Sequence, residues 1–468
     1  MLNRLDLVSD TMSVSDTMSD TSDQVPEYVD RTEEETVLLE RQFKGEAGYK
    51  GYAYVAPPAP GYDVRGVWHH FSAQTRSGYA AHGLALHQQL LDLLPTQLVP
   101  VHGGGLDIAE FPDDRAELLT SWMSNAHGVG LPEALICSLP PDPILHESMK
   151  GMTRSLVDYV AGPECTIVSP FAASMVNGPD LAALWCVSEF TYNAYVAGGA
   201  DLRKVRYIRP AICDGIWRDM FKPIDAIAWH KRDVFVFGTL GTWHERKGYR
   251  DLLRAYFSAF KRSDNVELHI RTSSLDSRMT IKRFEEKVIS EIAEVAKEFG
   301  DTNYPDSKRQ PKIKLITGTA LSDREVIEWL GSLDCYVNAS YAEGLGIPQT
   351  WAMAQGVPLV TSDFGTVGQL AKSAQLDLGT VYGLFMSEPS RVPSSMRSHS
   401  PIWHEYAQWG TYDVTHLAAA MTGQYMNGHS ANSALARWTR ELFSFDACRP
   451  LLREALGVVM RNDFNGWR

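Results

Sequence analysis

The chain has 468 residues, of which 44% are hydrophobic, and carries a net charge of −13 at neutral pH. This length suits two domains of about 200 residues each plus extensions, and no apolar run approaches the roughly 18 residues that a membrane-spanning helix requires. The six cysteines are scattered without a Cys-x-x-Cys pair, which is typical of reduced thiols and argues against disulfides and zinc sites.

The negative charge is concentrated at the N-terminus, because residues 1–40 hold 11 acidic and only 2 basic side chains. The segment also repeats Ser-Asp-Thr at three places. Such a polar, low-complexity sequence buries too little apolar surface to fold, so we expect residues 1–40 to be a disordered acidic tail. Acidic residues also interrupt the apolar core that a signal peptide needs, and we therefore expect a cytoplasmic protein. The near-neutral remainder lacks the basic surface that is typical of nucleic-acid binding.

Residues 41–225 alternate between apolar, strand-like segments and helical segments. A helix is predicted at 79–94, and strands are predicted at 64–71, 98–101, 134–138, 166–169, 184–187 and 205–208. This alternation predicts a parallel sheet with helices on both faces. A loop before the helix ends at Gly78, where free N–H groups of the helix can bind a phosphate or an acceptor.

Residues 226–430 repeat the same order, which predicts a second Rossmann-like domain. Strands are predicted at 233–238, 266–270, 312–316, 335–339 and 357–361. Helices are predicted at 249–261, 281–299 and 323–330, and from Pro348 onward. The Ser-, Pro- and Arg-rich stretch 389–401 is typical of a mobile surface excursion.

Two cations follow the first strand of this second domain. Arg246 and Lys247 lie at the turn into the next helix. Fixed cations at such a turn can bind a diphosphate, since Arg offers a bidentate fork and Lys a point charge. The alternative for Arg246 is an ordinary solvent-facing side chain.

A glycine loop follows a later strand of the same domain. The sequence Glu-Gly-Leu-Gly at 343–346 comes between the strand 335–339 and the helix that begins near Pro348. Glycines allow the backbone to approach a ligand closely, and the helix N-terminus offers free N–H groups to anions. Glu343 is the acidic residue at the mouth of this loop. Thr317 follows a neighbouring strand at the same edge of the sheet, where it could hold a nucleotide base.

The stretch 340–358 resembles the donor-site signature of GT-B glycosyltransferases of the retaining group 1, or family 4, type. That signature reads Ser-x-x-Glu-Gly-x-Gly-x-Pro-x-x-Glu-Ala-Met-Ala-x-Gly-x-Pro-Val. The positions that agree are Ser340, Glu343, Gly344, Gly346, Pro348, Ala352, Met353, Ala354, Gly356 and Pro358. The family's second Glu is replaced by Trp351. Lys247-Gly248 resembles the end of the family's Gly-Arg-x-x-x-x-Lys-Gly element, although Thr239 stands where the family has Arg.

The resemblance implies an α/β protein of GT-B fold, with two Rossmann-like doubly wound parallel-sheet domains and an interdomain cleft. The N-terminal acceptor domain would span 41–225 and the nucleotide-sugar donor domain 226–430. Helices in 431–468 would cross back toward the first domain. It also implies a hexosyltransferase that uses a nucleotide-diphospho-sugar as donor, retains the anomeric configuration, and needs neither a metal nor a cofactor. The sequence fits this, since it contains no Asp-x-Asp metal motif and no phosphate-loop, serine-elbow or zinc-helix motif.

The resemblance further implies roles for individual residues. Lys247 and Arg246 would neutralise the departing diphosphate, and Glu343 would hold hydroxyl groups of the donor sugar. The front-face mechanism usually proposed for the family needs no protein nucleophile. A histidine of the first domain often touches the donor sugar, and His127 is a candidate beside the alternative of an ordinary surface or core histidine. The residues expected to bind the donor are Gly78, Thr239, Gly344, Leu345, Gly346, Trp351 and Thr317.

Two other functions remain open. Trp351 cannot accept the ribose hydrogen bonds that the family's second Glu accepts, so the chain could be a catalytically degenerate GT-B binding or scaffold protein. A DNA-modifying glycosyltransferase also uses this architecture. No motif names the donor nucleotide, the sugar, the oligomeric state or the acceptor, which could be a glycan, lipid, protein, nucleic acid or metabolite.

Overall fold

The computed structural model describes residues 66–71, 78–100, 119, 132–139, 146–147, 149, 153, 155–227, 233–274, 278–305, 309–317, 321–378, 383–397, 403–428 and 432–462. These residues belong to one compact unit, residues 52–468. The acidic tail predicted at 1–40 and the candidate sugar contact His127 lie outside the described residues. None of the helices that the structure describes is long and apolar enough to cross a membrane.

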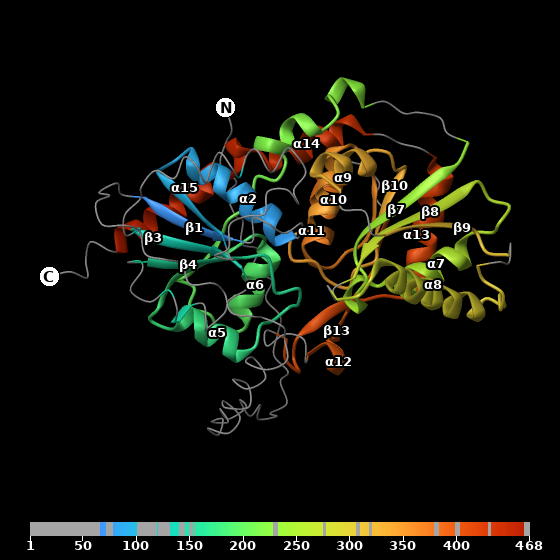
Figure 1. The fold of residues 1–468 in the computed structure, drawn as a ribbon, viewed down its shortest axis with the longest axis horizontal. Coiled ribbons are helices and arrows are strands. Elements are labelled where there is room, and N and C mark those ends of the chain that lie inside the picture. Colours follow the sequence, from blue (N-terminus) through green and yellow to red (C-terminus); the bar gives the residue numbers. More distant parts are fainter. Residues whose placement is uncertain are drawn as a thin grey trace, which may run out of the picture. The chain divides into compact units, whose positions relative to one another are not determined.

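Six strands form the first sheet in the order β2-β1-β3-β4-β5-β6, and every neighbouring pair is parallel. The strands are β1 (Val67–Phe71), β2 (Thr96–Pro100), β3 (Ala134–Ser138), β4 (Ser155–Val160), β5 (Leu181–Cys186) and β6 (Val205–Tyr207). The helices between them are α2 (Gly78–Leu91), α5 (Pro170–Asn177) and α6 (Glu189–Ala197) (Figure 1). The strands β1, β3 and β4 are buried along their whole length, as expected for central strands covered on both faces.

The strand predicted at 166–169 is wrong. Residues 161–169 form a loop that ends at Ser169, whose hydroxyl accepts a hydrogen bond from the N–H of Ala172 at 3.2 Å and so caps α5. The strand that belongs in this position is β4, which the sequence pattern did not reveal because Ser155 and Asp158 interrupt its apolar run. Asp158 is buried in the fold, where its carboxylate lies 2.8 Å from His146 Nε2.

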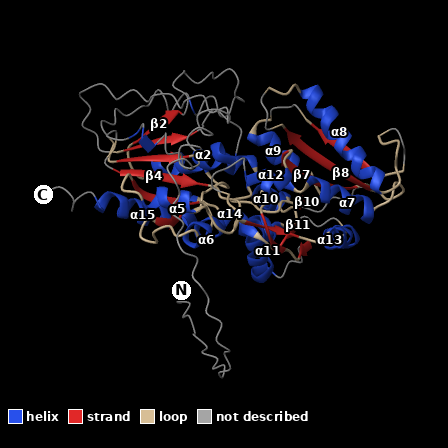
Figure 2. Cartoon of the chain, turned by 90° about the horizontal axis from the view of Figure 1, so that it is seen from below, coloured by secondary structure: helices blue, strands red, loops and turns tan. Residues whose placement is uncertain are grey.

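The second sheet has six parallel strands in the order β12-β11-β10-β7-β8-β9. They are β7 (Phe235–Thr242), β8 (Val266–Ser273), β9 (Lys312–Ile316), β10 (Cys335–Asn338), β11 (Leu359–Ser362) and β12 (Gly383–Phe385). The associated helices are α7 (Tyr249–Ala259), α8 (Ile281–Glu298), α9 (Asp323–Leu330), α10 (Ile347–Ala354), α11 (Gly365–Leu378) and α13 (Val414–Asn427). In Figure 2, helices flank both sheets.

The helices of the second domain divide between the two faces of its sheet. Residues of α7, α8 and α13 share one hydrophobic cluster with the strands, and residues of α9, α10 and α11 share another. In the first domain, α2 shares one cluster with the strands, and α5 and α6 share another. Both domains are thus doubly wound parallel sheets, and the predicted fold is confirmed.

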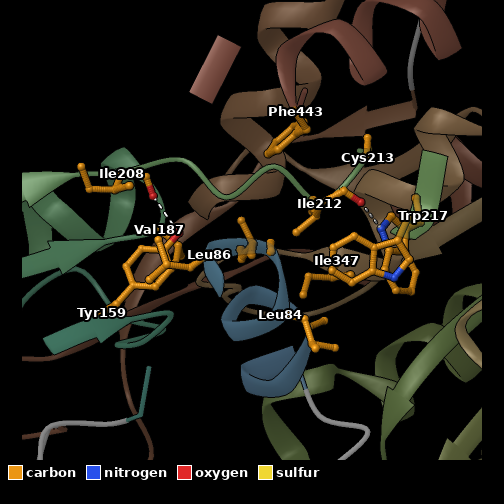
Figure 3. Packing of buried hydrophobic residues seen from close by; sticks show 14 of the residues in the cluster. Leu84, Leu86, Tyr159, Val187, Ile208, Ile212, Cys213, Trp217, Ile347 and Phe443 are labelled. Atoms are coloured by element: carbon orange, nitrogen blue, oxygen red, sulfur yellow. Dashed lines mark hydrogen bonds between the residues drawn. The ribbon is translucent and has the colours of Figure 1, made fainter. Parts of the chain in front are cut away.

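One hydrophobic cluster includes side chains from both domains. Leu84 and Leu86 of α2, Ile347 at the start of α10, Trp217 and Phe443 all belong to it (Figure 3). Because α10 begins at the glycine loop, this packing holds the loop against the first domain.

The last two helices are α14 (Ser433–Leu442) and α15 (Phe445–Asn462). The N–H of Phe445 donates to Asp214 Oδ2 at 2.9 Å, and Arg449 Nη2 lies 3.0 Å from Asp92 Oδ2, just beyond α2. The chain therefore returns to the first domain at its C-terminal end, as the resemblance implies.

Of the stretch predicted as a mobile excursion, residues 389–397 are folded, and residues 398–401 lie outside the described residues. It contains β13 (Glu388–Arg391) and α12 (Ser394–Arg397), and β13 pairs antiparallel with β14 (Gln408–Thr411). Val392 and Trp409 are buried in a small cluster with Cys165 of the first domain. The N–H of Thr166 donates to the carbonyl of Gln408 at 3.1 Å. The prediction failed for 389–397 because these apolar residues are spaced irregularly among Ser, Pro and Arg.

Candidate active site

The loop 339–346 connects the end of β10 to the start of α10. Gly346 has a φ of +76°, a conformation that favours glycine, and it occupies the N-cap of α10 without a capping side chain. Gly344 lies so close to the first domain that a Cβ there would be 1.7 Å from the carbonyl oxygen of Ala161. Ser188 Oγ donates to the Gly344 carbonyl at 2.7 Å. The free N–H groups of α10 therefore lie where the two domains meet.

Arg246 and Lys247 reach this loop because β7 and β10 are neighbours in the sheet. After β7 the chain forms a 3₁₀ turn, Glu245–Lys247, which ends at Gly248 with a φ of +65°. A Cβ at Gly248 would lie 2.1 Å from the carbonyl oxygen of Ala339, so only glycine lets the turn pack against the end of β10.

The Glu343 carboxylate is the centre of a buried charge cluster, since only 7% of the residue is exposed. Lys247 Nζ donates to Oε1 at 2.5 Å, Arg246 Nη1 donates to Oε2 at 3.3 Å, and Ser340 Oγ donates to Oε1 at 2.6 Å. Arg246 Nη1 also donates to the carbonyl of Ala342 at 2.6 Å. The three charged residues named by the sequence are thus brought together in one hydrogen-bonded group.

The cations decide the ionisation of Glu343. Burial by itself would raise the pKa of this carboxyl, but Lys247 and Arg246, together with the hydrogen bonds from Lys247 and Ser340, hold its pKa at about 2. Glu343 is therefore a carboxylate at neutral pH. Two cations and one anion leave the cluster with a net positive charge before other groups are counted.

Glu164 supplies a second carboxylate, which the sequence pattern did not reveal. It lies in the loop after β4, and its Oε1 is 3.1 Å from Arg246 Nη2, so Arg246 is shared between Glu164 and Glu343. The Arg246 Nε is buried and has no hydrogen-bond partner among the described residues. The signal that could have found Glu164 is its position after a strand end, but β4 itself was not predicted.

A cavity of about 680 Å³ opens beside this cluster. It is lined by the carboxyl ends of β7, β8 and β9 with the segments that follow them, by α9, by the glycine loop and the start of α10, and, from the first domain, by the start of α2 and the loop after β4. The residues singled out in the sequence that line it are Gly78, Arg246, Lys247, Thr317, Glu343, Gly344, Leu345 and Gly346.

Thr239 and Trp351 lie away from this lining. Thr239 is buried within β7. Trp351 is buried in the hydrophobic cluster, where its indole Nε1 donates to the carbonyl of Ile212 at 2.8 Å and its ring centroid lies 5.8 Å from that of Trp217. The indole therefore fastens α10 to the segment that connects the two domains.

Thr317 donates a hydrogen bond from its hydroxyl to Glu285, which fixes its side chain at the end of β9. Within the part of the chain that the structure describes, no three His, Cys, Asp or Glu side chains are grouped so that they could hold a metal ion.

Residues 231–378 match the model of the family "Glycosyl transferases group 1". These residues, about a third of the chain, resemble a group 1 glycosyltransferase domain. The match covers β7 to α11, including the turn with Arg246 and Lys247 and the loop with Glu343. The prediction that the chain is a glycosyltransferase is confirmed.

Solved structures extend the likeness to both domains. HepE from Anabaena in complex with UDP-glucose is 14% identical, covers 84% of this chain and 99% of its own, and has a TM-score of 0.54. A glycosyltransferase from Rickettsia africae is 14% identical, covers 87% and 100%, and has a TM-score of 0.52. Trehalose-6-phosphate synthase OtsA is 8% identical, covers 84% and 98%, and has a TM-score of 0.52. These similarities support the two-domain GT-B fold. No curated protein sequence matches the chain.

Proposed function

We propose that the chain transfers a sugar from a nucleoside diphosphate sugar to an acceptor, and that the reaction takes place in the cavity beside Glu343. The observation that carries this proposal is the group of Arg246, Lys247 and Glu343 at the N-terminus of α10, on the wall of that cavity. The complex of HepE with UDP-glucose supports the class of donor.

The two cations are suited to the hard step of the reaction. When the glycosidic bond to the diphosphate breaks, negative charge grows on the departing phosphate oxygen. Lys247 and Arg246 are already ordered by Glu343, so they need little rearrangement to stabilise that charge. The free N–H groups at the start of α10 add a second, uncharged source of stabilisation.

Glu343 has a separate role in this proposal. Ser340 and Lys247 both donate to Oε1, which fixes the orientation of the carboxylate. An ionised carboxylate accepts hydrogen bonds from hydroxyl groups, so Glu343 would orient the donor sugar. The sugar would then lie next to Gly344, close to the first domain, where an acceptor can approach it.

The order of the strands gives the cavity two ends. Among the lining residues, the loops after β10 and β7 carry the charges of Glu343, Arg246 and Lys247, whereas the ends of β8 and β9 carry Ser273, Thr317 and one charged residue, Arg271. Neighbouring strands are about 4.8 Å apart, so β10 and β9, three strand spacings apart, are separated by about 14 Å. We assign the diphosphate and sugar to the first end and the nucleoside to the second.

We further propose that the anomeric configuration is retained and that no metal is required. Both rest on the resemblance to the retaining group 1 enzymes, and the second is supported by Arg246 and Lys247, which can supply the positive charge that a divalent cation would otherwise give. Product analysis by NMR tests retention. Turnover that survives EDTA tests metal independence, and activity that returns only with added Mg²⁺ or Mn²⁺ would refute it.

Calorimetric binding of UDP, GDP and ADP to the full chain tests the donor site. We expect one or more of them to bind, and Lys247→Ala to weaken that binding by roughly 10- to 100-fold, the value of a charge-assisted hydrogen bond to phosphate. Lys287→Ala is the matched control, because Lys287 is an exposed residue on α8 that pairs with Glu291. Binding that is unaffected by Lys247→Ala, or absent for all three ligands, would count against the proposed site.

A further inference from the structure

Arg271 is a cationic residue of the cavity that the proposed chemistry does not use. It lies on β8 next to Ile316 of β9, with which it is in register. Side chains alternate along β8, so Ile270 faces the hydrophobic cluster of α7 and α8 while Arg271 lies on the opposite face, toward α9. Arg271 also lines the cavity, together with the neighbouring Thr272 and Ser273.

The N–H groups of the Arg271 guanidinium are available to bind a ligand. It forms no hydrogen bond or ion pair with any residue that the structure describes, although the charge of Glu325 is near enough to influence it. It lies over the ring of Trp329 of α9, whose centroid is 5.7 Å from the Arg271 Cζ. Burial lowers the pKa of Arg271, which reflects partial loss of water around the group. Stacking on Trp329 orients the plane of the guanidinium but satisfies none of its N–H groups.

The position of Arg271 separates it from the diphosphate cations. Lys247 follows β7 and Glu343 follows β10, while Arg271 is at the end of β8, on the side of β7 away from β10. The residues beside Arg271 in the lining are apolar, namely Ile316, Leu321 and Val326. A flat, uncharged ring with a few polar atoms at its edge fits this end of the cavity better than a phosphate does.

We propose that Arg271 selects the donor nucleotide, and that the base it accepts carries a ring carbonyl oxygen, as uracil, thymine and guanine do. This inference rests on the proposed function, because it assumes that the cavity binds a nucleoside diphosphate. Arg271 is a specificity-determining residue in this view and takes no part in breaking the glycosidic bond.

The chemistry follows from the donors of the guanidinium. Arg has five N–H donors and no acceptor, so it discriminates by pairing with carbonyl oxygens and unprotonated ring nitrogens. Guanine offers O6 and N7 side by side, and uracil offers O4. Adenine offers N7 beside an amino group, which also donates and cannot pair with Arg. Its N7 can accept one N–H of Arg271 but the amino group beside it opposes a second, whereas a carbonyl oxygen accepts two, so ADP pairs with Arg271 more weakly.

Calorimetry with UDP, dTDP, GDP and ADP on the full chain tests this inference. In the wild-type chain we expect UDP or GDP to bind at least about tenfold more tightly than ADP, the discrimination typical of a good Arg–base pair. Arg271→Ala should bring the preferred ligand down to the level of ADP and leave ADP unchanged. Arg271→Lys keeps the charge and the contact with Trp329 but loses the planar fork, and should lose most of the preference. Arg250→Ala is the control, because Arg250 lies on the surface of α7 and pairs with Glu294.

The outcomes separate this inference from the proposed function. If nucleoside diphosphates bind and Lys247→Ala weakens them, but the preference is unchanged in Arg271→Ala, Arg271 does not select the base. An equal weakening of all four ligands in Arg271→Ala would show a phosphate contact and also overturn it. A preference of the wild-type chain for ADP would also overturn the inference about Arg271. If none of the four ligands binds, the proposed function and this inference fail together.

Discussion

The two domains differ in the polar groups that they bury beside the cavity. The first domain buries histidines, among them His69, His82 and His87, whereas the second buries the ion cluster of Lys247 and Glu343. Burial lowers the pKa of His82 to about 4 and that of His87 to about 3, so both are neutral at pH 7. The same degree of burial leaves Glu343 fully ionised, because its cationic partners are within hydrogen-bond distance.

This contrast shows how one fold can place both neutral and charged polar groups beside the same cavity. A group that loses water either becomes neutral or acquires a counter-charge. Glu343 of the second domain keeps its charge beside Lys247, and the second domain thereby holds fixed charges at the proposed diphosphate site. In the first domain, His82 and His87 of α2 become neutral and present uncharged donors and acceptors, although the buried Asp158 there is paired with His146. His82 Nδ1, for example, lies 3.1 Å from the carbonyl of Gly78 at the cavity edge.

The largest expected effect comes from removing the charge of Glu343. Glu343→Gln leaves Lys247 without its anionic partner, and we expect the free energy of unfolding at pH 7 to fall by roughly 3 kcal/mol, as when a buried ion pair loses one member. Urea denaturation measures this loss. The folded-state pKa of about 2 lies below the ordinary 4.5, so the carboxylate stabilises the fold above pH 4.5 and this stability is lost as the pH falls toward 2. The difference between variant and wild type should shrink over that range.

Glu294→Gln provides the control for that experiment, because Glu294 belongs to an exposed pair on α8. It should change stability by no more than about 1 kcal/mol. A Glu343→Gln chain that is as stable as the wild type would show that the buried cluster does not stabilise the second domain.

The buried histidines should make the first domain the more acid-sensitive one. A base with a lower pKa in the folded state binds fewer protons than in the unfolded state, so stability is complete above pH 6.5 and falls below it. At pH 5, His82 and His87 should each cost about 2 kcal/mol. Hydrogen exchange, corrected for intrinsic rates, should show β1 and β3 losing protection between pH 6.5 and 5 before β7 and β10 do. Equal loss of protection in both sheets over that pH range would show that the first domain is not the more acid-sensitive one.

A smaller effect should follow from freeing Arg246. Glu164 shares Arg246 with Glu343, so Glu164 competes with a bound diphosphate for the same cation. Glu164→Gln should tighten binding of the preferred nucleoside diphosphate by roughly fivefold, equivalent to about 1 kcal/mol for a partly exposed pair. Glu245→Gln is the control, since Glu245 is an exposed neighbour of Arg246 outside the cavity lining. Weaker binding in Glu164→Gln would mean that Glu164 contacts the ligand directly.

The smallest effect concerns Trp351. Trp351→Phe removes the hydrogen bond to the Ile212 carbonyl and should lower the free energy of unfolding by about 1 kcal/mol. The dissociation constant of the nucleoside diphosphate should not change, because Trp351 lies outside the cavity lining. Denaturation and calorimetry on the same preparation give both values. Loss of ligand affinity at unchanged stability would assign the indole to the binding site.

The sequence predicted the second domain better than the first for a physical reason. Strands such as Lys312–Ile316 and helices such as Asp323–Leu330 have regular spacing and a clear cap, so the pattern and the structure agree. In the first domain, β4 contains a buried Asp158 that is satisfied only by the distant His146. No local pattern reveals such a long-range partner.

The site residues were likewise predictable only where a local sequence pattern marks them. Arg246, Lys247 and Glu343 were found because each follows a strand in a recognisable motif. Glu164 reaches them from the other domain, so only the folded chain brings it near. Trp351 occupies a motif position, yet its indole turns into the core, where it donates to the Ile212 carbonyl.

The segment with β13, α12 and β14 also limits how the cavity could open to release products. Its strand β14 is hydrogen-bonded to Thr166, and its Trp409 is packed in a cluster with Cys165, while Ser188 binds the glycine loop at Gly344. Any rotation that widens the cavity must break one of these contacts or pivot about it. Burial raises the pKa of the Cys165 thiol to about 12, which keeps it unreactive while the excursion is in place. The rate at which an alkylating reagent labels Cys165 would therefore report how often the excursion separates from the first domain and exposes the thiol.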